Sequence, residues 1–470
     1  MQRVADSCVN WISNKFKEKE NFYIFCGNGN NGGGGFALAK IMYHNGFDIT
    51  VFLNENENFS KDAASNLKKI KPISGIDIFD FNDAATFNFK ENAVIIDAVF
   101  GTGLNRRTNK KEVDLITFLN GVKLPKVSID MPSGLLADQM ITDQTVIFKA
   151  DETLSFQFWK KTFLHPETGI YCGKVHILDI SLSEEFIHDE ITSDYVIDDQ
   201  LIHRIYKTRS EFSHKGNFGK TTIIAGSFGR VGAAVLAVKA ALKSGSGLTF
   251  VHAPKCGYEI LQTSCPEAIY LYGGENHHDR FQIDHDTVVG IGPSLGINTD
   301  TESAFMDFLK SCDQPMVLDA DALNIISRHS QFLARIPENS IITPHPKEFE
   351  RLFGITENSF DRVELAREKA AELGIYIVLK DHHTQIITPE KDVFYNITGN
   401  SGMAKGGSGD ALLGIITSLL AQNYSSKDAA IFGVWLHGKA GDLAAEKFSK
   451  EAMLPTDLIN ELGMVFKSLA

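Results

Sequence analysis

The sequence predicts an α/β protein of two domains, each built around a parallel β-sheet with helices on its faces. Short apolar stretches such as 22–26 and 288–291 read as buried strands, and each ends in glycine or polar residues. Helical patterns such as 362–373 alternate with them, as in sheets whose parallel strands are connected by helices. A chain of 470 residues exceeds one typical core. We therefore expect domains at 1–190 and 195–470, divided within an acidic, polar segment near 182–212.

Composition narrows the function classes. The formal net charge is −13 and the sequence has no basic tract, so we expect no nucleic-acid partner. Its 6 cysteines are scattered without a C-x-x-C pair, which favours a reducing, cytoplasmic location over a disulfide framework. The sequence starts without an apolar signal core and contains no run of 18 apolar residues, so we expect no membrane contact.

The first domain begins with an amphipathic helix through residues 4–16, then a strand at 22–26. The glycine-rich turn 27–35 and a helical pattern follow directly. Strand, glycine turn and helix are the layout of a dinucleotide-binding first unit, although G-x-G-x-x-G is a weak signal in so glycine-rich a stretch. Glu55 and Glu57 near the second strand could meet a ribose, or could belong to a solvated loop.

Polar side chains follow three strands of this first sheet. Asn31 follows the first strand, Asp97 ends the strand at 93–96, and Asp130 and Ser133 follow the strand at 126–129. The carboxyl ends of parallel strands converge on one crevice. Carboxylate, amide and hydroxyl oxygens with few formal charges suggest a monovalent cation. The alternative is that both aspartates merely form turns before glycines.

In the second domain, a glycine turn at 226–234 follows the strand 221–225 but lacks the G-K-[ST] of a P-loop. His345 lies between two prolines, where it could contact a substrate or could start the next helix. His382 and His383 are adjacent, so their side chains diverge, and we interpret them as loop residues, not metal ligands.

The stretch 400–410, N-S-G-M-A-K-G-G-S-G-D, organises the second domain. Gly406, Gly407 and Gly409 permit backbone conformations closed to other residues and bring N–H groups close to an anion. The apolar helix that follows adds positive partial charge at its start. Asp410 is the one carboxylate of this stretch and is placed to take a proton from a hydroxyl that attacks phosphorus. It could instead be an N-cap residue.

Eight motifs in order cover nearly the whole chain. They are G-N-N-G-G, D-A-V-F-G-T-G, D-M-P-S-G, H-K-G-N-F-G, G-I-G-P-S-L-G, D-A-D-A-L-N, T-P-H-P-K-E and G-M-A-K-G-G-S-G-D. This set resembles the bifunctional NAD(P)H-hydrate repair enzymes. The resemblance implies a Rossmann-like epimerase domain, a three-layer sandwich, followed by a ribokinase-like dehydratase domain. It also implies that hydrates of NADH and NADPH are substrates, that ADP is the phosphoryl donor with Mg²⁺, and that the protein is a homo-oligomer.

The resemblance also assigns site residues. Beside these assignments, we choose Asp97 for proton transfer in the epimerase, with potassium setting its position, and our hypothesis for the dehydratase base is Asp410. A potassium ion would bind Asn31, Asp97 and Ser133 in the first domain. The epimerase substrate would contact Asn30, Asn31, Gly32, Gly33, Gly34, Gly101, Thr102, Gly103, Leu104, Asn105, Arg106, Arg107 and Asp130. The dehydratase substrate would contact Ala233, Gly296, His345 and Asp410, and the nucleotide Lys380, Asp381, His382, His383, Thr384 and Gly409.

The sequence departs from the family pattern in three places. The family loop usually reads N-N-G-G-D-G, but position 34 is Gly, which removes a carboxylate from the epimerase site. Family members usually carry a segment before the first helix, so we expect either a start upstream of Met1 or a sheet without that cover. G-P-S-L-G and K-D-H-H-T replace the usual G-P-G-L-G and K-G.

Two rival functions remain open at this stage. The same G-S-G-D would serve a ribokinase-like small-molecule kinase, which would leave a stable phosphorylated product. The first domain could also be a binding or oligomerisation module without catalysis, given Gly34.

Overall fold

The structure is a computed structural model that describes residues 1–17, 19, 21–54, 58–104, 106, 108–141, 145–284 and 286–470. The chain forms two compact units. The first comprises Met1–Ile191 with Asn358–Phe360, and the second Thr192–Glu357 with Asp361–Ala470. Among the described residues, no helix is long and apolar enough to cross a membrane.

The first unit contains a seven-stranded sheet in the order β3-β2-β1-β4-β5-β6-β7, and all its strands are parallel. Its strands are β1 (Asn21–Cys26), β2 (Asp48–Leu53), β3 (Ile76–Asp80), β4 (Ala93–Ala98), β5 (Lys126–Ile129), β6 (Glu152–Phe156) and β7 (Lys174–Leu178). Its helices are α1 (Gln2–Lys15), α2 (Asn30–His44), α3 (Lys61–Ile70), η1 (Phe81–Thr86), α4 (Lys110–Gly121), α5 (Lys161–Leu164), α6 (Pro166–Gly169) and α7 (Glu184–Asp189).

Two apolar clusters lie on opposite faces of this sheet. On one face, α1, α2 and α3 bury residues such as Ile12 and Phe36 against the strands. On the other face, α4 and η1 pack on an aromatic group that includes Phe25 stacked on Phe52, with ring centroids 4.6 Å apart. Helices on both faces of a parallel sheet make the three-layer sandwich that the sequence predicts.

The second unit contains a ten-stranded sheet in the order β11-β10-β9-β12-β13-β14-β15-β16-β17-β8. Neighbouring strands are parallel except where β16 pairs with β15 and β17. Its strands are β8 (Asp194–Ile197), β9 (Lys220–Ile224), β10 (Leu248–Ala253), β11 (Ile269–Tyr272), β12 (Val288–Ile291), β13 (Met316–Leu318), β14 (Ile341–Ile342), β15 (Tyr376–Leu379), β16 (Gln385–Ile387) and β17 (Val393–Asn396).

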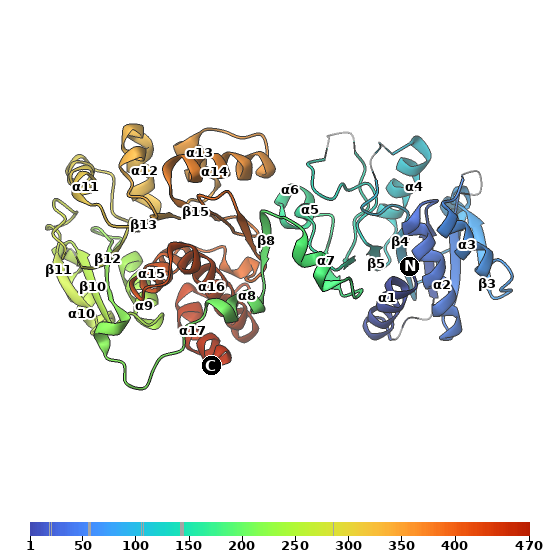
Figure 1. The fold of residues 1–470 in the computed structure, drawn as a ribbon, viewed down its shortest axis with the longest axis horizontal. Helices are drawn as coiled ribbons and strands as arrows, with labels where there is room; N and C mark the ends of the chain where they lie inside the picture. Colours follow the sequence, from blue (N-terminus) through green and yellow to red (C-terminus); the bar gives the residue numbers. More distant parts are fainter. Residues whose placement is uncertain are drawn as a thin grey trace. The chain divides into compact units, whose positions relative to one another are not determined.

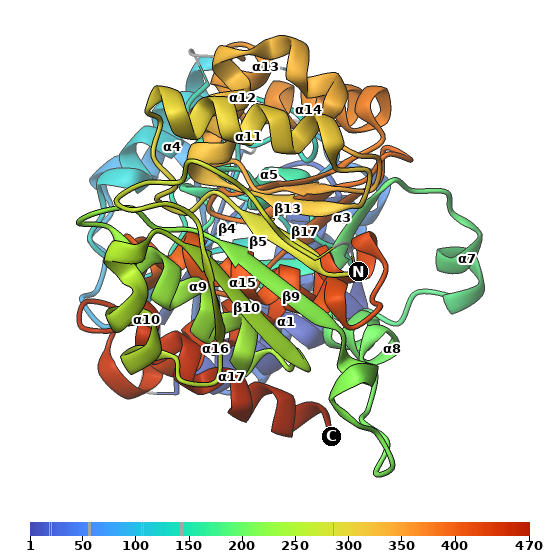
Figure 2. The same ribbon diagram turned by 90° about the vertical axis from the view of Figure 1, so that its left-hand side faces the viewer.

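Helices cover both faces of the second sheet as well (Figures 1 and 2). On one side lie α11 (Thr299–Ser311), α12 (Ala320–Arg328), α13 (Pro346–Phe353) and α14 (Ser359–Leu373). On the other side lie α9 (Val231–Lys243), α15 (Ser408–Ala421), α16 (Ser426–Phe448) and α17 (Pro455–Leu469). Shorter elements are α8 (Asp199–Ile205), α10 (Tyr258–Ser264), η2 (Lys215–Phe218), η3 (Lys255–Gly257), η4 (Ser330–Arg335) and η5 (Ser401–Met403).

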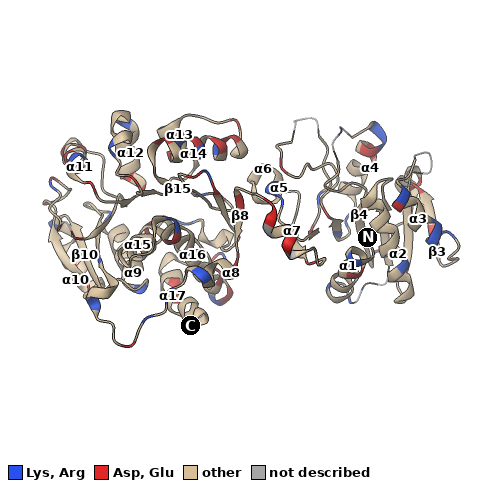
Figure 3. Ribbon diagram, in the orientation of Figure 1, with Lys and Arg blue, Asp and Glu red and all other residues tan. Residues whose placement is uncertain are grey.

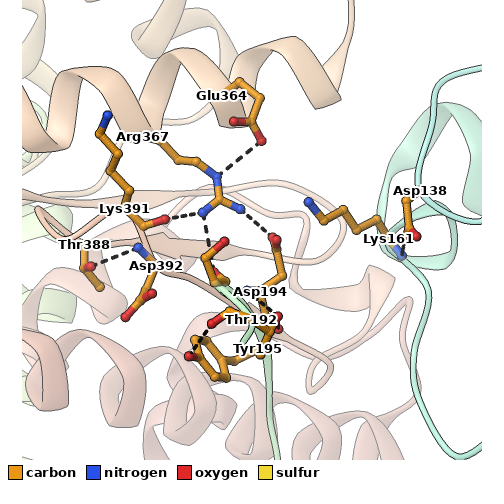
Figure 4. Close-up of polar contacts among 11 residues, drawn as sticks. Asp138, Lys161, Thr192, Asp194, Tyr195, Glu364, Arg367, Thr388, Lys391 and Asp392 are labelled. Carbon is orange, nitrogen blue, oxygen red and sulfur yellow. Dashed lines mark hydrogen bonds and ion pairs between the residues drawn. The ribbon is translucent and has the colours of Figure 1, made fainter. Parts of the chain in front are cut away.

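The outer strand β8 is held by Arg367 of α14 (Figure 4). This guanidinium donates to the Asp194 carboxylate at 2.6 Å and to the backbone carbonyl of Lys391. Strand β8 and helix α8 lie inside the segment 182–212 that we had interpreted as a polar boundary. The pattern did not reveal β8 because it has only 4 residues and alternates weakly between buried and exposed positions.

Charged residues of both signs are interspersed along the outer helices (Figure 3). Helices α3, α4 and α11 each carry acidic residues in the first turn and α3 and α11 carry lysines in the last. Charges placed in this way interact favourably with the helix dipole.

Candidate active sites

A pocket of about 630 Å³ opens in the first unit, where β1, β4 and β5 end. Parallel strands bring their carboxyl ends to one edge, so loops distant in sequence meet there. The pocket is lined by Met1, Val4, Asn28, Gly29, Asn30, Asn31, Gly34, Ser60, Val99, Phe100, Gly101, Thr102, Gly103, Leu104, Arg106, Asp130 and Phe156.

The glycine run forms the start of a helix, not the turn that we expected. Helix α2 begins at Asn30, so Gly32 to Gly35 are helical and buried. A Cβ added at Gly32 would overlap the Gly27 carbonyl oxygen, and one at Gly35 would lie 2.6 Å from Cys26 Sγ. Close packing of α2 on β1 therefore explains these glycines. Gly34 differs, because a Cβ there would meet no heavy atom within 4 Å and the residue lines the pocket.

Asp97 lies within β4 and is almost fully buried, with 1% of its surface exposed. Its carboxylate accepts hydrogen bonds from Ser133 N at 2.8 Å, Ser133 Oγ at 2.5 Å, Ser128 Oγ at 3.0 Å and Val99 N at 3.2 Å. Burial raises the pKa of Asp97 to about 6, against these hydrogen bonds, which lower it. Asp97 is not among the lining residues of the pocket.

The three residues expected to hold potassium are linked through Phe100. Asn31 Nδ2 donates to the carbonyl oxygens of Phe100 at 2.7 Å and Ile129 at 3.0 Å. Ser133 Oγ accepts from Phe100 N at 2.9 Å and donates to Asp97. The structure therefore gathers a carboxylate, a hydroxyl, an amide and backbone carbonyls from three adjacent strand ends. The carboxylate, hydroxyl and carbonyl oxygens carry one formal charge, and Asn31 contacts the carbonyl oxygens through its amide nitrogen.

Asp130 presents its carboxylate to the pocket. Its backbone has φ of +69°, in the left-handed region that residues with side chains rarely adopt. Oδ2 accepts a hydrogen bond from Thr102 N at 2.8 Å, and Oδ1 lies 3.6 Å from Lys160 Nζ. Sequence reasoning missed Lys160, which follows β6 in an ordinary-looking F-W-K-K stretch.

The structure describes only some of the other residues that we expect at the epimerase site. Arg106 lines the pocket and pairs with Glu112, with NH2 and Oε1 2.6 Å apart. Asn105 and Arg107 lie outside the described residues, as do Glu55 and Glu57.

The second site forms where β9, β12, β13, β14 and β15 end, beside the start of α15. Gly407 is the N-cap of α15 with φ of +101°, a conformation that favours glycine. Asp410 is the third residue of this helix, so it is not the N-cap. Burial, with a smaller contribution from the charge of Asp319, raises the pKa of Asp410 to about 6.

Asp410 is not the only carboxylate at this helix start. Asp319 follows β13 and pairs with Lys380, which follows β15, with Oδ1 and Nζ 2.8 Å apart. A Cβ added at Gly409 would lie 3.4 Å from Asp319 Oδ2 and 3.5 Å from Lys380 Nζ. The structure thus brings Gly409, Asp410 and Lys380 together, as expected, and adds Asp319. The signal for Asp319 was its place in D-A-D-A-L-N directly after a strand.

His345 starts a helix, one of the two roles left open for it. It is the N-cap of α13, and Nδ1 accepts from Lys347 N at 3.1 Å and Glu348 N at 3.3 Å. Glu348 Oε2 accepts from His345 N at 2.9 Å and lies 3.9 Å from Lys380 Nζ. Burial lowers the pKa of His345. His345 is therefore connected to Lys380 through Glu348, which contacts both residues.

Gly296 and Ala233 lie at neighbouring strand ends. Gly296 N donates to Asp321 Oδ2 at 2.9 Å, and the charge of Asp321 is among those that raise the pKa of Asp410. Ala233 lies half-buried in the first turn of α9. Leu236, one turn further along α9, lies against Gly407.

The segment 380–384 connects β15 to β16. Asp381 Oδ1 accepts from His382 N at 2.8 Å, and Asp381 Oδ2 lies 3.4 Å from Arg362 NH1. His382 Nδ1 and His383 Nδ1 are 3.1 Å apart, so the two rings face each other, and the prediction that they diverge is wrong; Thr384 is half-buried. Within the described residues, no group of three or more His, Cys, Asp or Glu side chains could hold a metal ion.

Comparisons with known proteins find the same enzyme family along nearly the whole chain. Residues 221–463 match the family model described as NAD(P)H-hydrate dehydratase, and residues 1–162 the one described as YjeF-related protein N-terminus. The bifunctional NAD(P)H-hydrate repair enzyme Nnr of Coxiella burnetii is 31% identical over 468 residues, covering 99% of this chain and 94% of that protein. The Vibrio cholerae enzyme of the same name is 33% identical, covering 92% and 85%.

A solved structure also resembles the second unit. The ADP/ATP-dependent NAD(P)H-hydrate dehydratase from Bacillus subtilis, co-crystallised with ATP/Mg²⁺, is 31% identical with a TM-score of 0.53. The match covers 59% of this chain and 99% of that one. The chain therefore belongs to the family of bifunctional NAD(P)H-hydrate repair enzymes.

Proposed function

We propose that this protein repairs hydrated NADH and NADPH in two steps. The first unit interconverts the two epimers at C6 of the reduced ring, and the second dehydrates the S form. ADP donates a phosphoryl group in the second step, so AMP and phosphate are the co-products. The proposal is supported by the names of the relatives and by the nucleotide-dependent dehydratase that resembles the second unit. Six free cysteines suit a cytoplasmic site of action.

The single observation that carries the dehydratase is the position of Asp410. Its carboxylate lies in the first turn of a helix whose free N–H groups attract phosphate oxygens. A base with a pKa of about 6 is ionised at neutral pH yet still takes up a proton readily. Asp410 would accept the proton of the C6 hydroxyl as its oxygen attacks the β-phosphorus of ADP.

The chemistry balances without an oxidant. Hydroxide is a poor leaving group, whereas phosphate is a good one. After transfer, the C6–O bond breaks with its electron pair on phosphate, and C5 loses a proton. The C5=C6 double bond is then restored and NADH or NADPH is released.

The nucleotide would lie between the segment 380–384 and the glycines before α15. Lys380 supplies a cation, and its Nζ lies 3.5 Å from where a Cβ of Gly409 would be, beside the start of α15. The chain offers no protein cage for Mg²⁺ among the described residues, which suits an ion that arrives on the nucleotide phosphates. When bound, Mg²⁺ would neutralise part of the phosphate charge. Ala233, Gly296 and His345 would contact the hydrate.

In the first unit, the oxygen set of Asn31, Asp97 and Ser133 fits a potassium ion, because one buried carboxylate balances one charge. When bound, the ion would stabilise the charged form of Asp97. Asp97 in turn holds the 97–100 turn and Ser133 in place. The hydrate would occupy the pocket against Asn30, Gly101 and Asp130.

The test combines Asp410→Asn with product analysis. Wild-type protein with mixed hydrate epimers and ADP should return the nicotinamide absorbance with equal amounts of AMP and phosphate. Asp410→Asn should lose roughly 10²–10⁴-fold in rate and still bind ADP. A stable phosphorylated hydrate would indicate a kinase instead, and an unchanged rate would exclude Asp410 as the base.

A further inference from the structure

Asp319 is a buried carboxylate to which the proposed reaction assigns no task. It follows β13 and is 2% exposed, and its N–H donates to the Ile291 carbonyl at 3.1 Å. The next residue, Ala320, has φ of +48°, which a residue with a side chain rarely adopts. The backbone thus fixes the direction in which Asp319 leaves the strand.

The partner of Asp319 comes from another strand end. Lys380 Nζ donates to Asp319 Oδ1 at 2.8 Å and lies 3.9 Å from Glu348 Oε2. The Asp319 and Lys380 side chains are 3% and 22% exposed. Taking such charges out of water costs about as much as their attraction returns, so a buried ion pair is weak evidence for stability. A role in the reaction is the better explanation for this one.

Both members of the pair face the helix that carries the catalytic base. Gly409 has no side chain, and the Asp319 Oδ2 and Lys380 Nζ atoms are within 3.5 Å of where its Cβ would be. A Cβ at these distances would only touch the two atoms, so the ion pair lies directly against the second residue of α15. The pair therefore reaches the turn that contains Asp410.

We infer that Asp319 is a positioning residue for phosphoryl transfer, which holds the Lys380 ammonium against the first turn of α15 and places a second negative charge beside Asp410. The inference rests on the proposed dehydratase function. It assigns two separate effects to one side chain, the placement of a phosphate-binding cation and the strengthening of the base.

The charges around Asp410 make these effects separable. Asp319 and Asp321 raise the pKa of Asp410, and Lys380 lowers it. Glu348 and His345 of α13 face Lys380, not Asp410. His437 of α16 is buried beneath the same helix start, where Nε2 lies 3.0 Å from Ser408 O, and burial lowers its pKa to about 4. Removing Asp319 and removing Lys380 should therefore move the titration of Asp410 in opposite directions.

The experiment measures kcat/KM for hydrate dehydration against pH, at saturating ADP, for the full chain. The acid limb should move down by about one pH unit in Asp319→Asn and up in Lys380→Met, the size expected for one nearby charge. Asp319→Glu keeps the charge and should restore the position of the limb. Asp307→Asn removes an equal charge from the exposed side of α11, where it pairs with Lys310, and should leave the limb in place.

The outcomes separate the inference from the function on which it rests. Each variant is first checked for a cooperative thermal unfolding transition of the second unit without ADP, which shows that this unit is folded. A purely structural Asp319 would lower the rate at every pH without moving the limb, and this result would overturn the inference. If Asp319→Asn does not fold, an unmoved or lowered limb in Lys380→Met overturns it. An inactive wild-type protein would overturn the proposed function instead.

Discussion

The Nζ of Lys160 lies 3.6 Å from Oδ1 of Asp130, and both side chains are mostly buried in the first unit, at 13% and 14% exposure. The ammonium also donates to Ser155 Oγ at 2.6 Å and to the carbonyls of Phe156 at 3.2 Å and Phe158 at 3.1 Å. Three neutral acceptors use all three of its N–H groups. The Lys160 ammonium therefore attracts the Asp130 carboxylate electrostatically while its N–H groups bind other acceptors. The carboxylate can still bind a ligand.

Lys160→Met should accordingly weaken epimerisation. Loss of the charge that faces Asp130 should lower kcat/KM for the conversion of the R hydrate roughly 10- to 100-fold, which corresponds to about 1.4–2.7 kcal/mol. The assay uses an Asp410→Asn background, in which dehydration cannot consume the product. Lys174→Met on the exposed face of β7 is the matched control. Equal rates in both variants would show that Lys160 has no part in the first pocket.

Gly34 offers a test of gain of function. Its Cβ would meet open space and it lines the pocket, so an added side chain enters the pocket without a clash. Gly34→Asp restores the family's loop, and aspartate is also more favourable than glycine within a helix such as α2. We expect an unchanged or higher Tm and faster epimerisation. Gly35→Ala, one residue on, should lower stability by about 1–3 kcal/mol, because its Cβ would lie 2.8 Å from that of Ala98.

The sequence predicted the elements whose signal is local. Strands β5 and β12 have the predicted bounds because short apolar runs end at turn residues. The glycine pattern predicted a turn where helix α2 begins, and this prediction was wrong. The glycines there are required by the close packing of α2 on β1. Likewise, the sequence placed Asp410 where the glycine stretch meets the following helix, but did not place Asp319 or Lys160 beside their partners. Those pairs join residues 61 and 30 positions apart, and only the strand order of the sheet brings them together.

The potassium site can be tested by its effect on stability. A ligand at one hundred times its Kd stabilises the folded state by about 2.7 kcal/mol. Potassium chloride should therefore raise the Tm of the first unit by a few degrees over tetramethylammonium chloride at equal ionic strength. Asp97→Asn should abolish this difference, whereas Asp77→Asn on β3 should keep it. An equal potassium effect in Asp97→Asn would place the ion elsewhere.

The burial of His252 and His278 predicts that the second unit becomes less stable to unfolding at acidic pH. Both rings are fully buried and stack with centroids 5.4 Å apart, and each also stacks on Phe281. Burial lowers the pKa of His252 to about 4 and that of His278 to about 3. Unfolded histidine titrates near 6.5, so both rings are neutral when folded and the unfolded chain takes up protons first as pH falls.

The stability that this burial contributes is complete above pH 6.5 or so and is lost as pH falls toward the folded pKa values. For His252 the loss approaches about 3 kcal/mol. Urea unfolding of the second unit at pH 7 and pH 4.5 measures it. His252→Phe should reduce the difference between the two midpoints, and His203→Gln on α8, whose ring is exposed, should not. An identical pH dependence in His252→Phe would assign the acid sensitivity to other groups.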